Sequence, residues 1–202
     1  ARVDAENVTD VDTWTAVGVE QGRGRRHQEI IEWWRFGRAD VVEALSRMMA
    51  TERVPWIYGD MSARSFATMR LMETWAHGLD IKAAILGRMT PLDEPPDDDD
   101  EEYDDPLADT MRLRHIAALG QLSLPWAFEQ AGEEFPEQGI RVEVMGPLYA
   151  AWRFGPEDTD QVVKGMASDW CRVVCQRATA DETGLKAVGE YAEKALEIAR
   201  AY

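Results

Sequence analysis

The chain has 202 residues, 45% hydrophobic and 30% charged, a composition typical of a folded globular protein with one or two domains. Its formal net charge is −16 and no basic run offsets it, so we expect neither nucleic acid nor an anionic membrane as partner. No apolar run approaches the ~20 residues of a membrane span. With only two cysteines, a disulfide framework is excluded, and we expect a reducing, cytoplasmic setting.

The acidity is mostly local. Residues 93–105, DEPPDDDDEEYDD, contain ten acids, and removing ten negative charges from −16 leaves −6, an ordinary value for a small domain. Like charges repel and two prolines interrupt the run, so we predict an acidic disordered loop. A loop that engages a basic partner is the alternative to a simple solvated linker.

Helical spacing of apolar residues predicts the elements of the first two thirds of the chain. A loop at TERVPWIYGDM separates the second helix from the third, because Pro55 and Gly59 interrupt the pattern. Ser62 is the expected N-cap of the third helix, and Pro106 a favoured first-turn residue of the fourth. The predicted helices are a short one at 11–19, then 26–50, 62–86 and 106–131.

The pattern changes after residue 139. IRVEVMG alternates in the strand period, Gly146 and Pro147 make a turn, and LYAAWRF reads as a second strand. A helix capped by Asp158 or Thr159 and a last helix at 185–198 are predicted to follow. The predicted fold class is therefore α with a small α+β C-terminal domain: an incomplete helical bundle of three long helices at 1–136, then a domain of two strands and two helices at 137–202.

The helix at 62–86 carries a row of polar side chains. Arg70, Glu73, His77 and Asp80 recur at intervals of three or four residues and, at about 100° per residue, form one narrow stripe. Apolar residues flank the stripe and cover the opposite side, so we expect this helix to be buried. A buried carboxylate and a buried imidazole must be paired, hydrogen-bonded or bound to a metal.

Spacing alone leaves two interpretations of this row open. Glu73 and His77 are four residues apart and can bind the same divalent cation, although at least one further ligand must come from another element. Alternatively, Arg70 and Glu73 form an ion pair while His77 and Asp80 hydrogen-bond each other, because charged pairs at this spacing are common on helices.

The stretch RVPWIYGDMSARSFATMRLMETWAHGLD, which ends at Asp80, resembles the helical metal-binding domain of mycothiol-dependent maleylpyruvate isomerases, members of the DinB-like superfamily. Residues 61–68 and 70–78 are similar to the motif of one actinobacterial branch of that family. The resemblance continues through LRHIAALG, RVEVMGPLYAAWRFGPED and VCQR, and therefore covers most of the chain after about Val54.

The resemblance implies a four-helix bundle that binds a divalent metal, often zinc, through one His on the first helix and an E-x-x-x-H pair on the third. That pair falls on Glu73 and His77. The resemblance also implies an Arg in the C-terminal domain that holds an acidic substrate, and by position Arg177 is the candidate; a helix-terminal Arg that stabilises the dipole is the alternative. A low-molecular-weight thiol is implied by the family alone.

The family's first helix, with its metal-binding His, has no counterpart in this sequence. His27 lies among arginines at the start of the 26–50 helix, so we predict that it is exposed. Three explanations stay open. The chain, which starts at Ala1, is a piece of a longer protein; a second chain supplies the missing helix in a homo- or hetero-oligomer; or the site is lost and the scaffold is used differently.

Three further kinds of residue are candidates for a role in the site. His115, in RLRHIAALG, is a candidate ligand or general acid/base directed into the bundle, with an ordinary core or surface histidine as the alternative. Trp56, beside a proline in a loop, is a candidate pocket wall. Cys171 and Cys175 are four apart on one predicted helix, where a disulfide would distort the backbone, so we expect packing roles.

Three function classes are compatible with the sequence. The first is a metal-dependent isomerase or thiol-dependent transferase of a small acidic or electrophilic metabolite, in which the metal is a Lewis acid and Asp80 or His115 moves protons. Arg70, Trp56 and Arg177 would bind the substrate. The second is a metal-free biosynthetic enzyme, a cyclase or isomerase, that uses the same polar row for acid/base chemistry. The third is a non-catalytic binding protein.

Overall fold

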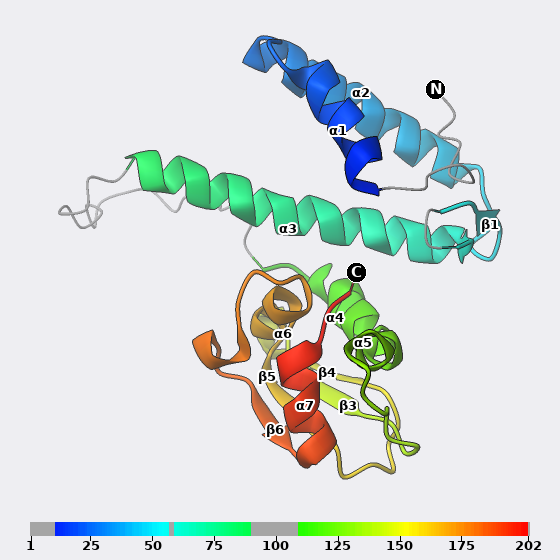
Figure 1. The fold of residues 1–202 in the computed structure, drawn as a ribbon, viewed down its shortest axis with the longest axis vertical. Coiled ribbons are helices and arrows are strands. Elements are labelled where there is room, and N and C mark those ends of the chain that lie inside the picture. Colours follow the sequence, from blue (N-terminus) through cyan, green and yellow to red (C-terminus); the bar gives the residue numbers. More distant parts are fainter. Residues whose placement is uncertain (1–10, 57–58, 90–108, 202) are drawn as a thin grey trace. The chain divides into compact units, whose positions relative to one another are not determined.

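The computed structural model describes residues 11–56, 59–89 and 109–201, in two compact units that divide between residues 67 and 68 (Figure 1). The first unit confirms the two predicted N-terminal helices. Its elements are α1 (Val11–Gly22), α2 (His27–Ser46), and the two-stranded ladder of β1 (Arg53–Val54) with β2 (Met61–Ser62). The helix α3 (Ala63–Met89) begins in the first unit and continues in the second.

Local signals at the helix ends agree with the sequence. The Ser65 backbone N–H donates to the Ser62 hydroxyl at 3.1 Å, which confirms Ser62 as the cap of α3. The Arg26 N–H donates to the Glu29 carboxylate at 3.0 Å at the start of α2. His27 is exposed, as expected. None of the helices in the described ranges is both long and apolar enough to cross a membrane.

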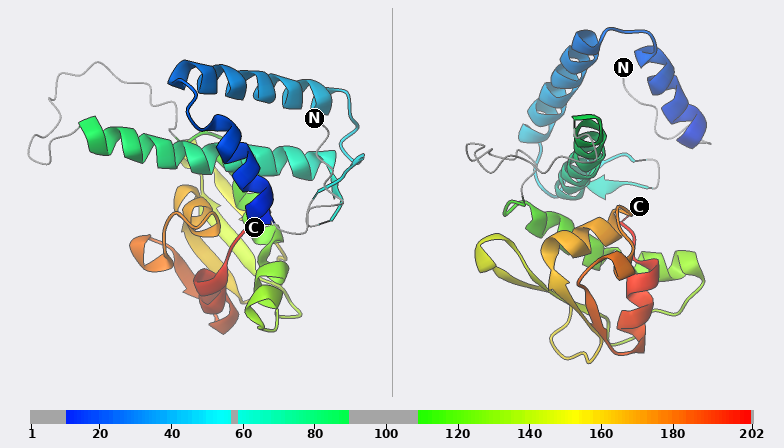
Figure 2. Two further views of the ribbon diagram at one scale, coloured as in Figure 1. Left: turned by 45° about the horizontal axis from the view of Figure 1, so that its top comes forward. Right: turned by 90° about the vertical axis from the view of Figure 1, so that its left-hand side faces the viewer.

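The second unit contains most of α3, the helices α4 to α7 and one small sheet (Figure 2). The sheet has the order β4-β3-β5-β6, in which β3 runs antiparallel to β4 and parallel to β5, and β5 runs antiparallel to β6. The core of the unit joins the sheet to Met72 and Ala76 of α3. The elements after α3 are α4 (Leu113–Leu122), α5 (Leu124–Ala131), β3 (Arg141–Met145), β4 (Ala151–Phe154), β5 (Val162–Met166), α6 (Ala167–Val174), β6 (Lys186–Val188) and α7 (Glu190–Ile198).

Helices α4 and α6 are packed in close contact. The indole N–H of the fully buried Trp170 donates to the Ala117 carbonyl at 3.0 Å. One turn further along α4, Gly120 is buried, and a Cβ added there would lie 2.8 Å from a methyl carbon of Val174. The absence of a side chain at Gly120 therefore sets how closely the two helices approach.

Two predicted helices of the C-terminal region are wrong in part. The segment with Val162 and Val163 forms β5, because these β-branched residues pair with β3 rather than continuing into a helix. Likewise Val188 belongs to β6, and Gly189, with φ of 92°, separates that strand from α7. The sheet thus has four strands instead of two, while the small α+β region that contains it is confirmed. The second predicted strand starts only at Ala151.

The predicted helix at 106–131 is two helices where it is described. It breaks at Ser123, the C-cap of α4, and Pro125 lies in the first turn of α5, where a missing N–H costs nothing. The acidic run at 93–105 lies outside the described residues. The domain boundary predicted near residue 136 and the completeness of the helical bundle stay predictions.

Gly120→Ala should lower the free energy of unfolding by about 1–3 kcal/mol, because the added methyl group overpacks the α4–α6 contact. The measurement is urea denaturation followed by the fluorescence of the buried tryptophans. With Val174→Ala in the same chain, the loss should be smaller than the sum of the two single losses.

Gly37→Ala is the matched control, since Gly37 is helical in α2 and nothing lies within 4 Å of an added Cβ. That change should be neutral or slightly stabilising, because alanine is the better helix former. Equal losses at the two positions would contradict the close α4–α6 contact.

Candidate functional site

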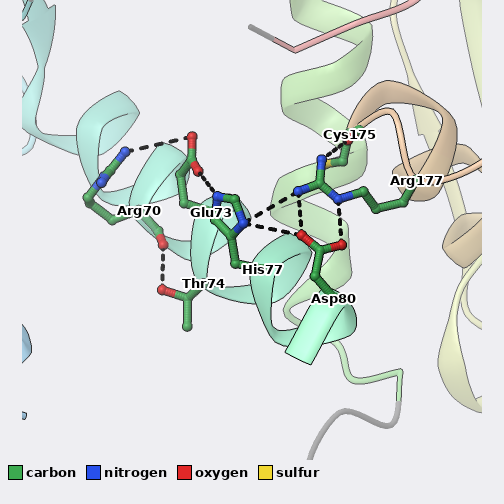
Figure 3. Close-up of polar contacts among 7 residues, drawn as sticks. All are labelled: Arg70, Glu73, Thr74, His77, Asp80, Cys175 and Arg177. Carbon is green, nitrogen blue, oxygen red and sulfur yellow. Dashed lines mark hydrogen bonds and ion pairs between the residues drawn. The ribbon is translucent and has the colours of Figure 1, made fainter. Parts of the chain in front are cut away.

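The polar row on α3 forms a chain of contacts (Figure 3). Nε2 of His77 lies 3.1 Å from Oε2 of Glu73, and Nδ1 of His77 lies 3.2 Å from Oδ2 of Asp80. On the preceding turn of α3, a guanidinium nitrogen of Arg70 lies 3.8 Å from Oε1 of Glu73. The row predicted from spacing is confirmed as a connected set, and both pairs of the ion-pair interpretation are present.

His77 stands between two carboxylates. An imidazole nitrogen hydrogen-bonds a carboxylate only when it carries a proton, so both contacts are favourable together only when both ring nitrogens are protonated. A divalent cation between Nε2 and the Glu73 oxygen would replace one of these protons. The position between Glu73 and His77 therefore suits either a proton or a metal ion, and the structure of the row is compatible with each.

Arg177 approaches this row from the end of α6. Its Nε and one terminal nitrogen donate to the two Asp80 carboxylate oxygens at 2.9 and 2.7 Å. Its other terminal nitrogen donates to the Cys175 carbonyl at 2.7 Å, which holds the guanidinium against the helix end. Two parallel hydrogen bonds in this form give the strongest and most directional contact between Arg and a carboxylate.

The chain reverses sharply before Arg177. Gln176 adopts a left-handed conformation with φ of 57°, and the Arg177 N–H donates to the Arg172 carbonyl at 2.8 Å, which ends α6. This turn directs the Arg177 side chain toward α3. The guanidinium of Arg177, hydrogen-bonded to Asp80, lowers the pKa of that carboxyl below its ordinary value of 3.8.

The expectation that this row is buried is wrong for His77, whose side chain is 63% exposed. Met72 and Ala76 are the residues of α3 that enter the core. At about 100° per residue, the centre of the polar row lies roughly 90° around the helix from them. The row therefore borders the buried stripe, and Glu73 is only 27% exposed while His77 extends outward.

The structure brings together some of the predicted site residues and not others. Arg177 joins Glu73, His77 and Asp80, although nothing in the spacing of the sequence connects residue 177 with residue 80. His115 is exposed on α4, and no hydrogen bond or ion pair links its side chain to this row among the described residues. Trp56 belongs to the first unit, where its ring meets Phe66 edge to face at 5.6 Å.

The two cysteines have the packing role that the sequence predicted. Both are buried and neither forms a disulfide, and the Cys171 thiol lies 3.7 Å from the Leu113 carbonyl on α4. Burial raises the pKa of the Cys175 thiol to about 12, and burial also raises that of Cys171. Neither thiol is a thiolate at neutral pH, so the chain itself offers no activated cysteine at this site.

The donor set for a metal is incomplete in the part of the chain that is described. Glu73 and His77 supply one oxygen and one nitrogen, a chemically suitable pair. No group of three or more His, Cys, Asp or Glu side chains that could hold a metal ion occurs in the described ranges. Two donors do not make a protein metal site, so a third must come from outside the described residues if a cation binds here.

A cavity of about 580 Å³ lies beside Arg177, between the end of α6 and the end of α7. Sequence reasoning missed its acidic rim of Asp181, Glu182 and Glu197. Part of this rim could have been found in the sequence, because TADE at 179–182 is a capping-box pattern. In the structure, the Thr179 N–H donates to the Glu182 carboxylate at 2.8 Å.

Comparison with known proteins gives a family and two relatives. Residues 1–82 match the family described as "Mycothiol maleylpyruvate isomerase N-terminal domain". The uncharacterized proteins MT0041 and Rv0036c of Mycobacterium tuberculosis, from strains CDC 1551 / Oshkosh and ATCC 25618 / H37Rv, are each 37% identical over 174 residues. The aligned region is 86% of this chain but only 61% of the length of either relative. No solved structure matches the chain.

In the folded protein, both cysteines should resist alkylation by iodoacetamide at pH 8. A raised pKa keeps a thiol protonated up to that pKa, so at pH 8 almost no thiolate is available at Cys175, and burial blocks access. Intact-mass spectrometry should show no adduct on the native protein and two adducts in urea. Rapid labelling of one native cysteine would contradict the buried packing role.

The Asp80 carboxyl should titrate below the ordinary aspartate value of 3.8, and Arg177→Gln should raise its pKa toward that value. A lowered pKa means that the ion pair is complete above that ordinary value and is lost as the pH falls through the pKa of the folded state. Carbon-13 NMR of the Asp80 carboxyl, followed as a function of pH, measures its pKa in the wild-type protein and in Arg177→Gln. An unchanged pKa in Arg177→Gln would show that the pair does not persist in solution.

Proposed function

We propose that this chain is part of an enzyme that isomerises or transfers a small acidic or electrophilic metabolite with the help of a low-molecular-weight thiol, because residues 1–82 match the family described as "Mycothiol maleylpyruvate isomerase N-terminal domain". The observation that carries the proposal is the contact chain from Glu73 through His77 and Asp80 to Arg177. A carboxylate, an imidazole and a guanidinium from two distant segments meet in one place with ordered geometry.

We propose that Glu73 and His77 are two ligands of a divalent-metal site, with zinc as the expected ion. Their atoms lie 3.1 Å apart and face each other. Nδ1 of His77 is held by Asp80, and a carboxylate on the second nitrogen is the usual partner of a metal-binding histidine, since it fixes the ring orientation. The chemistry a bound cation supplies is Lewis acidity.

We propose that Asp80 and Arg177 position the reacting groups. Asp80 is ionised and bonded on both oxygens, so its role is to orient His77 and Arg177 rather than to donate a proton. Arg177 carries the donor geometry that suits a carboxylate, and an acidic substrate could compete with Asp80 for it. Substrate binding by Arg70 and Trp56, and proton transfer by His115, stay predictions.

A metal-free enzyme is a second candidate, and one observation favours it. Both nitrogens of His77 have a carboxylate partner within the protein, so the row is electrostatically complete without a cation. In that case the imidazolium would donate a proton from Nε2 to the substrate, and Glu73 would accept the proton that the substrate releases at another atom and return it to His77. A non-catalytic binding role stays a prediction, because its motivating acidic run is not described.

The test is an activity assay of the full-length protein, in which the isomerisation of maleylpyruvate in the presence of mycothiol is followed by absorbance. Glu73→Gln should lower kcat/KM at least about 100-fold, and Asp80→Asn about 10- to 100-fold, the range for residues that orient a ligand. Glu129→Gln, at an exposed position on α5, is the matched control and should keep full activity.

Zinc content and chelation separate the two candidates. A metal enzyme loses activity with a chelator and regains it with zinc, whereas the metal-free enzyme keeps its activity and still depends on Glu73. If the wild-type protein shows no thiol-dependent turnover with or without zinc, the proposed reaction is wrong. Full activity in Glu73→Gln would remove the polar row from the mechanism.

A further inference from the structure

The second face of the sheet has a charge pattern that the proposed function does not use. Val142, Val144, Trp152 and Val163 are buried on the face that meets the helices. Side chains alternate along a strand, so the intervening residues share the opposite face, which we call the outer sheet face. The outer sheet face consists of Arg141, Glu143 and Met145 on β3, Ala151 and Arg153 on β4, Val162, Lys164 and Met166 on β5, and Lys186 and Val188 on β6.

One row of charged residues crosses all four strands of the outer sheet face. The strand register places Arg153 opposite Glu143, Glu143 opposite Lys164, and Lys164 opposite Lys186. Arg153 and Lys164 lie 3.7 and 3.5 Å from Glu143, and Arg141 lies 2.9 Å from it. Glu143, the one acid of the outer sheet face, is thus shared by three cations. Lys186 forms no ion pair with any of the described residues.

This row is an exception in a protein whose net charge is −16. Lys164 and Lys186 lie directly opposite each other, an arrangement of like charges that destabilises a sheet. Arg153 and Lys164 are 77% and 52% exposed, so burial does not require these charges to be here. The excess of positive charge is therefore available to a ligand.

An apolar row lies directly beside the charged one. Met145 is opposite both Ala151 and Met166, and the two methionines are 40% and 50% exposed. Beyond them, in the turn that joins β3 to β4, Leu148 and Tyr149 are almost fully exposed, with φ of 56° and 59°. Two successive left-handed residues other than glycine are strained, and such strain tends to occur where function uses the side chains.

We propose that the outer sheet face, with Leu148 and Tyr149, docks an acidic polypeptide segment that also carries apolar side chains. Carboxylates of the segment would pair with Arg153, Lys164 and Lys186. Apolar side chains of the segment would cover Met145 and Met166, whose flexible side chains adapt to a partner. Adjacent strands are about 4.8 Å apart, so the charged row spans roughly 15 Å, a length suited to a short extended peptide.

An acidic polypeptide fits this surface better than other anions. A nucleic acid or an anionic membrane extends far beyond the patch, and the remaining negative charge of the protein would repel it. Inorganic phosphate would use the cations but leave the methionines, Leu148 and Tyr149 uncovered. Only a polypeptide offers carboxylates and apolar groups at the spacing of neighbouring rows.

The probe is a fluorescein-labelled peptide of about six glutamates that ends in leucine and phenylalanine, titrated with the full chain by fluorescence anisotropy. Lys164→Glu should weaken binding about ten-fold, and Lys186→Glu, at the edge of the sheet, is a second variant that leaves the Glu143 contacts intact. Glu143→Gln should have the opposite effect and tighten binding about three-fold. A peptide of glutamates alone should bind more weakly, and Met166→Ser should affect only the peptide with apolar residues.

Arg172→Glu is the matched control, because it makes the same charge change at an exposed position on α6, away from the outer sheet face. It should change the affinity by less than about two-fold. Equal weakening by Arg172→Glu and Lys164→Glu would overturn the proposal, since net charge alone would then explain binding. No binding of the peptide, or tighter binding of duplex DNA or anionic phosphatidylserine vesicles, would overturn it as well.

Discussion

The bidentate contact between Arg177 and Asp80 is the interaction on which the candidate site depends. It joins α3 to the end of α6, segments separated by 97 positions in the chain, at distances of 2.9 and 2.7 Å. Asp80 in turn holds Nδ1 of His77, and His77 presents its other nitrogen to Glu73. Without Arg177, Asp80 would be a half-exposed carboxylate on α3, and the group that orients the His77 ring would itself lose its support.

The same geometry explains why two mechanisms compete for this site. Nε2 of His77 and Oε2 of Glu73 lie 3.1 Å apart, a separation that a hydrogen bond or a shared cation would fit, and both are consistent with the contact of the second nitrogen with Asp80. The similarity of residues 1–82 to the mycothiol maleylpyruvate isomerase N-terminal domain is the argument for the cation. The described residues supply only two donors, which makes the origin of a third ligand the central question about this protein. The chain spans 61% of the length of the two Mycobacterium tuberculosis proteins that it matches.

The two faces of the sheet differ in chemical character. One face packs valines and Trp152 against helices whose closeness is set by Gly120 and by the Trp170 hydrogen bond. The other carries three cations around Glu143, beside a row of methionines. Positive charge is thus concentrated in one place on an acidic protein, some distance along the sequence from the acidic run. Association with an acidic partner there would not need the polar row on α3.

The sequence by itself determined the helices of the first part, the Ser62 cap, the alternating strand at 141–145, the buried role of the two cysteines and the polar row of α3. These follow from local periodicity and capping, which act within one or two turns of backbone. It could not determine that Val162–Met166 is a strand, because short apolar runs suit a strand or a helix until a partner strand is present. Only the tertiary structure brought Arg177 to Asp80 and left His77 exposed beside the buried stripe, since these features depend on how distant segments pack. Only the strand register, which pairs distant segments of the chain, aligned Arg153, Lys164 and Lys186 in one row.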